Sequence, residues 1–138
     1  MANQDRTVLL TLPAGEEIEN PSVDLLTNLL LHADQKYWEY QSGTVGISFG
    51  HPKSSDYAEL VLVMRDPPGV YLQHTAADGR DEYCLSAGTD DTVVVAHLGG
   101  ESLELPARQV VPRALALRAV LEFTRSGKRA PDLTWDRI

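Results

Sequence analysis

Histidine and cysteine, the side chains that most often bind metals or act as nucleophiles, are few and scattered in this sequence. There are four histidines and one cysteine, namely His32, His51, His74, His97 and Cys84. No two histidines stand four residues apart and none adjoins the cysteine, so the usual zinc-binding patterns do not occur. A single thiol also excludes an intramolecular disulfide, which is typical of a reducing compartment. We therefore expect neither a metal nor a cofactor.

Two groups of carboxylates have the composition of a general acid–base pair. One is the segment 78–82, which contains Asp78, Asp81 and Glu82, and the other is the pair Asp90 and Asp91. Both groups fall in polar loops, where open solvent keeps pKa values near their usual range and favours a protein-binding edge over catalysis. The alternative is a small hydrolase that uses Asp90 or Asp91 with His97. Hydrogen-bond reach between this histidine and a carboxylate would favour that alternative.

Aromatic residues cluster in one short segment, Tyr37-Trp38-Glu39-Tyr40. In an extended strand, alternation would put Trp38 and Tyr40 on the same face. Core packing explains most such pairs, but an exposed pair can anchor an interface. A non-catalytic adaptor or homodimer built on this face is therefore a second alternative.

The charge of the chain is negative and unevenly distributed. The formal net charge is −8, and residues 1–104 hold 17 acidic and 5 basic side chains, whereas residues 105–138 hold 3 acidic and 7 basic ones. This sign argues against direct binding to nucleic acid, which needs a basic face. It fits either a well-solvated surface or a basic protein partner steered onto an acidic surface.

The N-terminal part predicts a strand followed by a helix. Residues 7–12 are β-branched and leucine-rich and are stopped by Pro13. Asn20-Pro21 has the form of a helix start, and we expect a helix over about 22–35. Its predicted buried stripe consists of Val23, Leu26, Leu30 and Ala33, widened by Leu25 and Leu29.

Residues 37–105 change to short segments bounded by Gly, Pro, Asp and Ser, which is the pattern of an antiparallel meander. The predicted strands are 37–40, 44–49, 57–64, 70–75, 82–86, 92–98 and 103–105. Cys84 falls within one of them, where a cysteine is usually a small buried hydrophobe.

A second helix is predicted from Val111-Pro112 to about Ser126, with Gly127 as a left-handed C-cap. Its expected packing face consists of Ala114, Leu117, Leu121 and Thr124, with Leu115 and Val120 beside it. The opposite side carries Arg118, Glu122 and Arg125, which we expect to be solvated. In the tail, Trp135 should pack back onto the body.

These elements predict one domain over residues 1–138 with an α+β fold. An antiparallel β-meander sheet would be packed on one face by two α-helices, leaving the other face or its loops for binding. The longest apolar runs are far shorter than the roughly 20 residues of a membrane span, and no secretory signal precedes the first strand. We expect a cytoplasmic protein with no membrane partner.

The last third of the chain resembles a known family. Val111-Pro112 opens an Ala/Leu helix, residues 124–129 read Thr-Arg-Ser-Gly-Lys-Arg, and Pro131-Asp132-Leu133-Thr134-Trp135 follows. This resembles the type-one Imm family of immunity proteins of bacterial polymorphic toxin systems, many of which accompany nucleic-acid deaminase toxins. The family usually has arginine and proline adjacent in this tail, whereas Ala130 separates them here.

The resemblance implies a non-catalytic inhibitor that binds a cognate toxin, a basic protein that acts on nucleic acid. The motif residues Pro131, Leu133 and Trp135 would be structural. Loop carboxylates would occupy the toxin's basic cleft by charge complementarity. Our predicted contacts are Asp78, Asp81, Glu82, Asp90, Asp91 and Glu101, which we expect adjacent hairpin loops of the meander to bring together. Trp38 and Tyr40 are candidate aromatic anchors.

Overall fold

A computed structural model describes residues 8–12, 15–32, 44–50, 58–65, 69–76, 81–98 and 101–138. Within these ranges it describes only the backbone of residues 44, 58–65, 96–98 and 101–103. The predicted strand 37–40, with Trp38 and Tyr40, and the predicted contact Asp78 lie outside the described residues.

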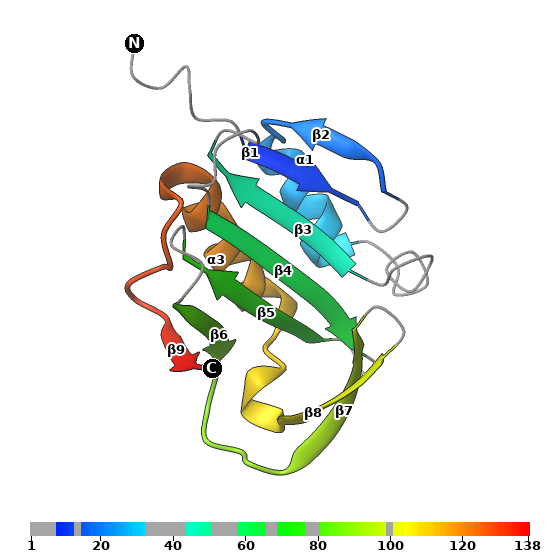
Figure 1. Cartoon of the computed structure of the whole chain (residues 1–138), viewed down its shortest axis with the longest axis vertical. Coiled ribbons are helices and arrows are strands. Elements are labelled where there is room, and N and C mark those ends of the chain that lie inside the picture. The colour runs from blue at the N-terminus through cyan, green and yellow to red at the C-terminus, as the bar shows by residue number, and fades with distance from the viewer. Residues whose placement is uncertain are drawn as a thin grey trace.

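Among the described residues, seven strands form one antiparallel sheet in the order β2-β1-β3-β4-β5-β6-β9 (Figure 1). Their bounds are β1 Val8–Thr11, β2 Glu17–Glu19, β3 Thr44–Phe49, β4 Ala58–Arg65, β5 Gly69–Thr75, β6 Glu82–Ser86 and β9 Thr134–Arg137. Strands β7 (Val93–Leu98) and β8 (Glu101–Pro106) pair only with each other and form a separate ribbon.

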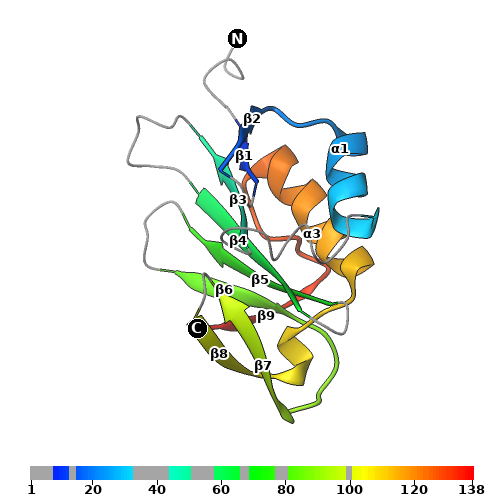
Figure 2. The same ribbon diagram turned by 90° about the vertical axis from the view of Figure 1, so that its right-hand side faces the viewer.

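Helices cover one face of this sheet. Helix α1 (Val23–Thr27) continues into the π-helical segment η2 (Asn28–His32), and α3 (Arg113–Ser126) follows the 3-10 turn η3 (Ala107–Gln109). Figure 2 shows α1 and α3 on one side of the sheet and the β7–β8 ribbon on the other. The predicted α+β class is therefore confirmed, with the addition that the ribbon covers part of the face left over by the helices. No helix in the described ranges is long and apolar enough to cross a bilayer.

The main core lies between the sheet and the helices. Alternate strand residues such as Leu10, Ile47, Leu72 and Leu85 are fully buried there, because every second side chain of a strand points to the same face. A smaller core lies on the opposite face, under the ribbon. It consists of Tyr71, Cys84 and Leu105, with Val94 and Val110 packed against them.

The predicted start of the first helix at about residue 22 agrees with the structure, but the predicted capping residue, Asn20, is wrong. Ser22 is the N-cap, and its Oγ accepts a hydrogen bond from the Leu25 backbone N–H at 3.1 Å. Asn20 instead sits in the left-handed region (φ 48°), and its Oδ1 accepts a bond from the Val8 N–H. Val23, predicted to be buried, is the first residue of the helix and is 62% exposed.

The predicted face of α3 is also displaced. Its buried residues are Ala116, Ala119, Val120 and Phe123, whereas Ala114 is exposed and Leu115, Leu117 and Leu121 only flank the core. The buried stripe lies directly opposite Arg118 and Arg125. The position of these charges therefore marks the packing face better than the leucines do, since leucines border the core on both sides.

Candidate functional site

The sheet face turned away from α1 and α3, here called the outer face, carries carboxylates at aligned positions. Strand register places six residues in one row across six strands, in the order Glu19, Leu9, Ser48, Glu59, Thr75 and Glu82. At about 4.8 Å per strand the row spans roughly 24 Å. Figure 1 looks onto this face, and at β1 and β3 no described helix or strand covers it. Sequence reasoning missed Glu17 and Glu19 because β2 is only three residues long.

Glu82 is held on the outer face by a short chain of hydrogen bonds. The Gln73 amide nitrogen donates to Glu82 Oε2 at 3.3 Å, and the Tyr71 hydroxyl donates to Gln73 Oε1 at 3.1 Å. Tyr71 lies under the ribbon, and burial raises its pKa to about 12, with smaller contributions from Cys84 and Glu82. The phenol therefore remains a donor at any physiological pH. Beside Glu82, the carboxylate of Asp81 pairs with Arg137 at 3.0 Å.

A second group of carboxylates fixes the base of the ribbon. Arg108 pairs with Asp91 and also, at 3.0 Å, with Asp136, which accepts a further bond from Gln109 at 3.1 Å. Burial raises the pKa of Asp136, but the bonds from Gln109 and Arg108 outweigh it and the net shift is downward. Asp90 Oδ1 accepts a hydrogen bond from the Thr92 N–H at 2.9 Å, which lowers its pKa. Asp90 and Asp136 therefore stay ionised. The ion pairs of Arg108 with Asp91 and Asp136 connect the β6–β7 loop to β9.

The structure does not bring the predicted acidic contacts into one loop cluster. Asp81 and Glu82 lie at the start of β6, whereas Asp90 and Asp91 follow its end, roughly 16 Å further along the strand. Glu101 begins β8 at the far end of the ribbon. The predicted adjacency was based on the order of hairpins in a meander, and the ribbon leaves the meander after β6.

The backbone positions that the structure describes do not favour the hydrolase alternative. His97 lies near the end of β7, five residues beyond Thr92, so its backbone is roughly 17 Å from the loop that carries Asp90 and Asp91. Both carboxylates already have other partners, the Thr92 amide for Asp90 and Arg108 for Asp91. Among the residues that the structure describes, no three His, Cys, Asp or Glu side chains are grouped to hold a metal ion.

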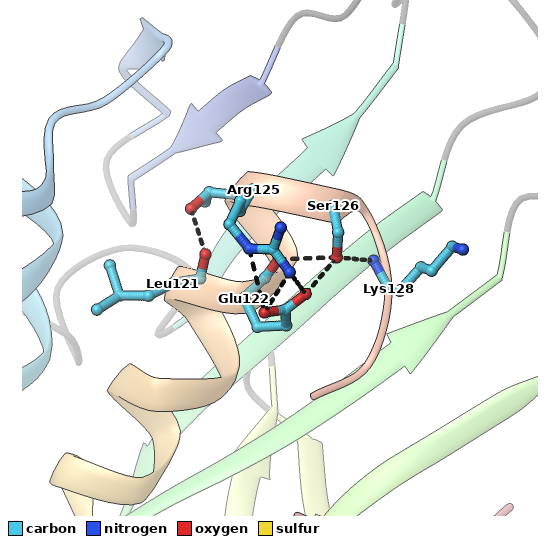
Figure 3. Close-up of polar contacts among 6 residues, drawn as sticks. Leu121, Glu122, Arg125, Ser126 and Lys128 are labelled. Atoms are coloured by element: carbon cyan, nitrogen blue, oxygen red, sulfur yellow. Dashed lines mark hydrogen bonds and ion pairs between the residues drawn. The ribbon is translucent and has the colours of Figure 1, made fainter. Parts of the chain in front are cut away.

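The charged side of α3 forms local ion pairs, as expected for a solvated helix face. Figure 3 shows the Glu122 carboxylate accepting hydrogen bonds from Arg125 and Ser126, and the Ser126 hydroxyl accepting one from the Lys128 N–H. The bond from Arg125 is the main cause of a lowered Glu122 pKa, followed by the bond from Ser126. Arg118 pairs with Asp132 of the tail. These contacts close the C-terminal end of the helix.

The C-terminal tail packs back onto the body as predicted and adds strand β9 to the sheet edge beside β6. Trp135 Nε1 donates to the Ala130 carbonyl at 3.0 Å, and the indole ring lies edge-on to His74 with centroids 6.3 Å apart. Leu133 packs against the main core and Pro131 is exposed. A structural role for Leu133 and Trp135 is consistent with these contacts.

The two faces of the molecule differ in how their charged side chains are paired. The carboxylates of Glu17, Glu19 and Glu82 point to the outer face and form none of the ion pairs of the described residues. Arg113, Arg118 and Arg125 all lie on α3, on the opposite side of the sheet. The outer face therefore carries carboxylates without an ion pair among the described residues, whereas on the helix side Asp132 and Glu122 are paired with Arg118 and Arg125.

The fold and the site define a small α+β domain with carboxylates on its outer face and a tail fixed by Trp135. The comparison with protein families identifies the family: residues 51–137 match the one described as Immunity protein Imm1. Because the match covers more than half of the chain, the protein belongs to the Imm1 family of immunity proteins, which neutralise toxins and are typically non-catalytic inhibitors. The match includes β4 through β9 and leaves β1 to β3 and α1 outside it. No curated protein matches the chain.

Proposed function

We propose that this immunity protein neutralises a nucleic-acid deaminase by placing its acidic outer face over the basic substrate cleft of the toxin. The observation that carries the proposal is the difference in charge pairing between the two faces. Glu17, Glu19 and Glu82 lie on the outer face without an ion pair among the described residues, while the arginines of α3 lie behind the sheet.

The physical reason is the requirement that the toxin itself must meet. An enzyme that acts on nucleic acid needs a positive cleft to hold phosphates, and the same potential attracts a rigid array of carboxylates. Opposite potentials raise the association rate and orient the encounter. Inhibition of this kind needs binding and no turnover, and an interface of about 800 Å² on each partner is sufficient. We place this action in the cytoplasm, where a deaminase would meet its nucleic-acid substrate.

Growth rescue is the first test. The toxin encoded by the neighbouring gene is expressed with and without this protein, and we expect growth to be restored only when both are present. Sequencing of cellular nucleic acid in the toxin-only cells should show converted bases. Rescue without base conversion would retain the immunity role and overturn the deaminase assignment, and a failure of rescue would overturn the proposed function itself.

The use of the outer face is tested by two variants with the same change of net charge. The variant E17Q/E19Q/E82Q removes three carboxylates from the outer face, and D24N/E122Q/D132N removes three from the helix side. We expect E17Q/E19Q/E82Q to slow association with the catalytically inactive toxin about tenfold at low salt and to weaken the salt dependence of the association rate. The variant D24N/E122Q/D132N should change the association rate less than twofold. Equal effects of the two variants would contradict a role for the outer face.

A further inference from the structure

The β7–β8 ribbon exposes apolar side chains on the face that points away from the sheet. Residues 93–95 are three consecutive valines, a pattern typical of a strand buried on both faces. In this protein only one of the two faces of that strand is turned towards the sheet. Val94 packs inward against the cluster of Tyr71, Cys84 and Leu105, whereas Val93 is 63% exposed and Val95 is 44% exposed. The side chains of Val93 and Val95 are therefore the exposed apolar part of the ribbon.

Register identifies what surrounds these valines. Pro106 lies opposite Val93 and the exposed Glu104 lies opposite Val95, so these four residues form what we call the ribbon face. Asp90 adds a further exposed carboxylate in the loop before β7. An apolar centre with a charged border is the usual arrangement of a protein–protein interface. The border here is acidic, because Arg108, the nearby base, is held by Asp91 and Asp136.

The base of the ribbon is held rigidly. The Ala107 N–H donates to the Thr92 carbonyl at 2.8 Å, the Arg108 N–H to the Asp90 carbonyl at 2.9 Å, and the Ala87 N–H to the Arg108 carbonyl at 2.8 Å. A two-stranded ribbon is only marginally stable alone, so these bonds and the small core below it fix its position. A surface fixed before binding loses little conformational entropy on association.

We propose that the ribbon face is the anchor of the toxin interface, with Val93 and Val95 buried against an apolar patch of the basic toxin and with Asp90 and Glu104 facing the positive residues around that patch. This inference rests on the proposed function and adds the contact that determines how long the complex lasts. The acidic outer face speeds the encounter, and the valines slow dissociation, since removing buried apolar contacts acts mainly on the off-rate.

The test uses isosteric substitutions. V93T/V95T keeps the shape and β-propensity of the ribbon but would place two hydroxyls in the interface, and V23T is the matched control because Val23 is exposed to nearly the same degree, 62%, on α1. Binding to the catalytically inactive toxin encoded by the neighbouring gene is measured by surface plasmon resonance. We expect V93T/V95T to weaken binding about 30-fold or more, almost entirely through faster dissociation, and V23T to leave it unchanged. Thermal melting of both variants should match that of the wild type.

Each other outcome is decisive. Wild-type binding with an unchanged off-rate in V93T/V95T would overturn the ribbon face and leave the proposed function intact. Equal weakening by V23T would likewise overturn it, because the effect would not be specific to the ribbon. A wild-type homodimer in analytical ultracentrifugation that V93T/V95T dissociates would assign the valines to a second copy of this chain instead. If the wild-type protein does not bind the toxin, both the proposed function and this inference are overturned.

Discussion

The imidazole Nε2 atom of His74, on β5, lies 3.4 Å from the carbonyl oxygen of Gly127. Gly127 is the C-cap of α3 and comes fifty-three residues later in the chain. The same ring meets Phe123 edge-on at 5.5 Å and Trp135 at 6.3 Å. One strand side chain therefore contacts the last turn of the helix, its C-cap and the C-terminal tail. The closure of the C-terminal half depends on this group of residues.

Gly127 should be the least replaceable glycine of the described chain. It has φ 74°, and a Cβ at this position would approach the Phe49 ring, with Cε1 at 2.8 Å. We expect G127A to lower the free energy of unfolding by about 2–4 kcal/mol, because a left-handed alanine costs roughly 1–2 kcal/mol and the Phe49 ring must also move. Urea denaturation measures this change.

The matched control for this prediction is G88A. Gly88 also has a positive φ, 80°, but nothing lies within 4 Å of its Cβ position. G88A should therefore lower the free energy of unfolding only by the cost of a left-handed alanine, about 1–2 kcal/mol. Equal losses in the two variants would show that the Phe49 contact has no energetic weight.

His74 should make stability depend on pH near neutrality. The residue is 4% exposed, and its Nδ1 has no hydrogen-bond partner within the described part of the chain. Burial lowers the pKa of His74 below the usual 6.5. The hydrogen bond with the Gly127 carbonyl raises the pKa, but by less than burial lowers it. The unfolded state then binds the proton more readily, so the free energy of unfolding falls as pH drops from about 6.5 towards the lower folded value, by at most 1.4 kcal/mol per pH unit.

The variant H74L should remove this dependence. Between pH 7.5 and 5 its free energy of unfolding should change less than that of the wild type, with the two curves diverging below about pH 6.5. The ionised carboxylates Asp136 and Glu122 have lowered pKa values from ordinary ones of 3.8 and 4.5, so their contribution is lost only at lower pH. Parallel pH profiles for wild type and H74L would refute the prediction.

Trp135 should contribute more by packing than by its hydrogen bond. W135F retains an aromatic ring against His74 but loses the hydrogen bond to the Ala130 carbonyl, so we expect the free energy of unfolding to fall by about 1 kcal/mol. W135A also removes the packing against the main core and should lower the free energy of unfolding by about 3 kcal/mol. Far-UV circular dichroism during urea denaturation checks both values. A similar loss in both variants would assign the effect to the hydrogen bond.

Cys84 should report the opening of the ribbon. It lies in the small core below the ribbon, and burial raises the pKa of its thiol to about 11, with a further upward contribution from Asp136. Labelling by a disulfide reagent at pH 8 should therefore be slow. L105A, which removes a contact above the thiol, should speed labelling at least tenfold, whereas V93A on the opposite side of the ribbon should not. Equal labelling rates in the two variants would mean that the thiol reacts by another route.

Local signals predicted the elements well where chain chemistry alone decides them. Strands 44–49 and 82–86 have the predicted bounds, and Gly127 is the predicted left-handed C-cap. Alternation of apolar side chains and the need for glycine at positive φ are properties of a few consecutive residues, so they can be read directly. Strands β2 and β9 gave no such signal, since three or four mixed residues become a strand only when a neighbouring edge pairs with them.

The sequence by itself determined the class of the fold, the acidic character and the resemblance to immunity proteins, because composition, periodicity and motifs need no partner in space. Tertiary structure alone decided that the β7–β8 ribbon leaves the meander, that Asp91 and Asp81 pair with Arg108 and Arg137, and that Glu19 aligns with Glu82 across the sheet. These relationships join residues far apart in the chain. They depend on strand register and on which face each element covers, and a one-residue slip would reverse the face of every side chain on a strand.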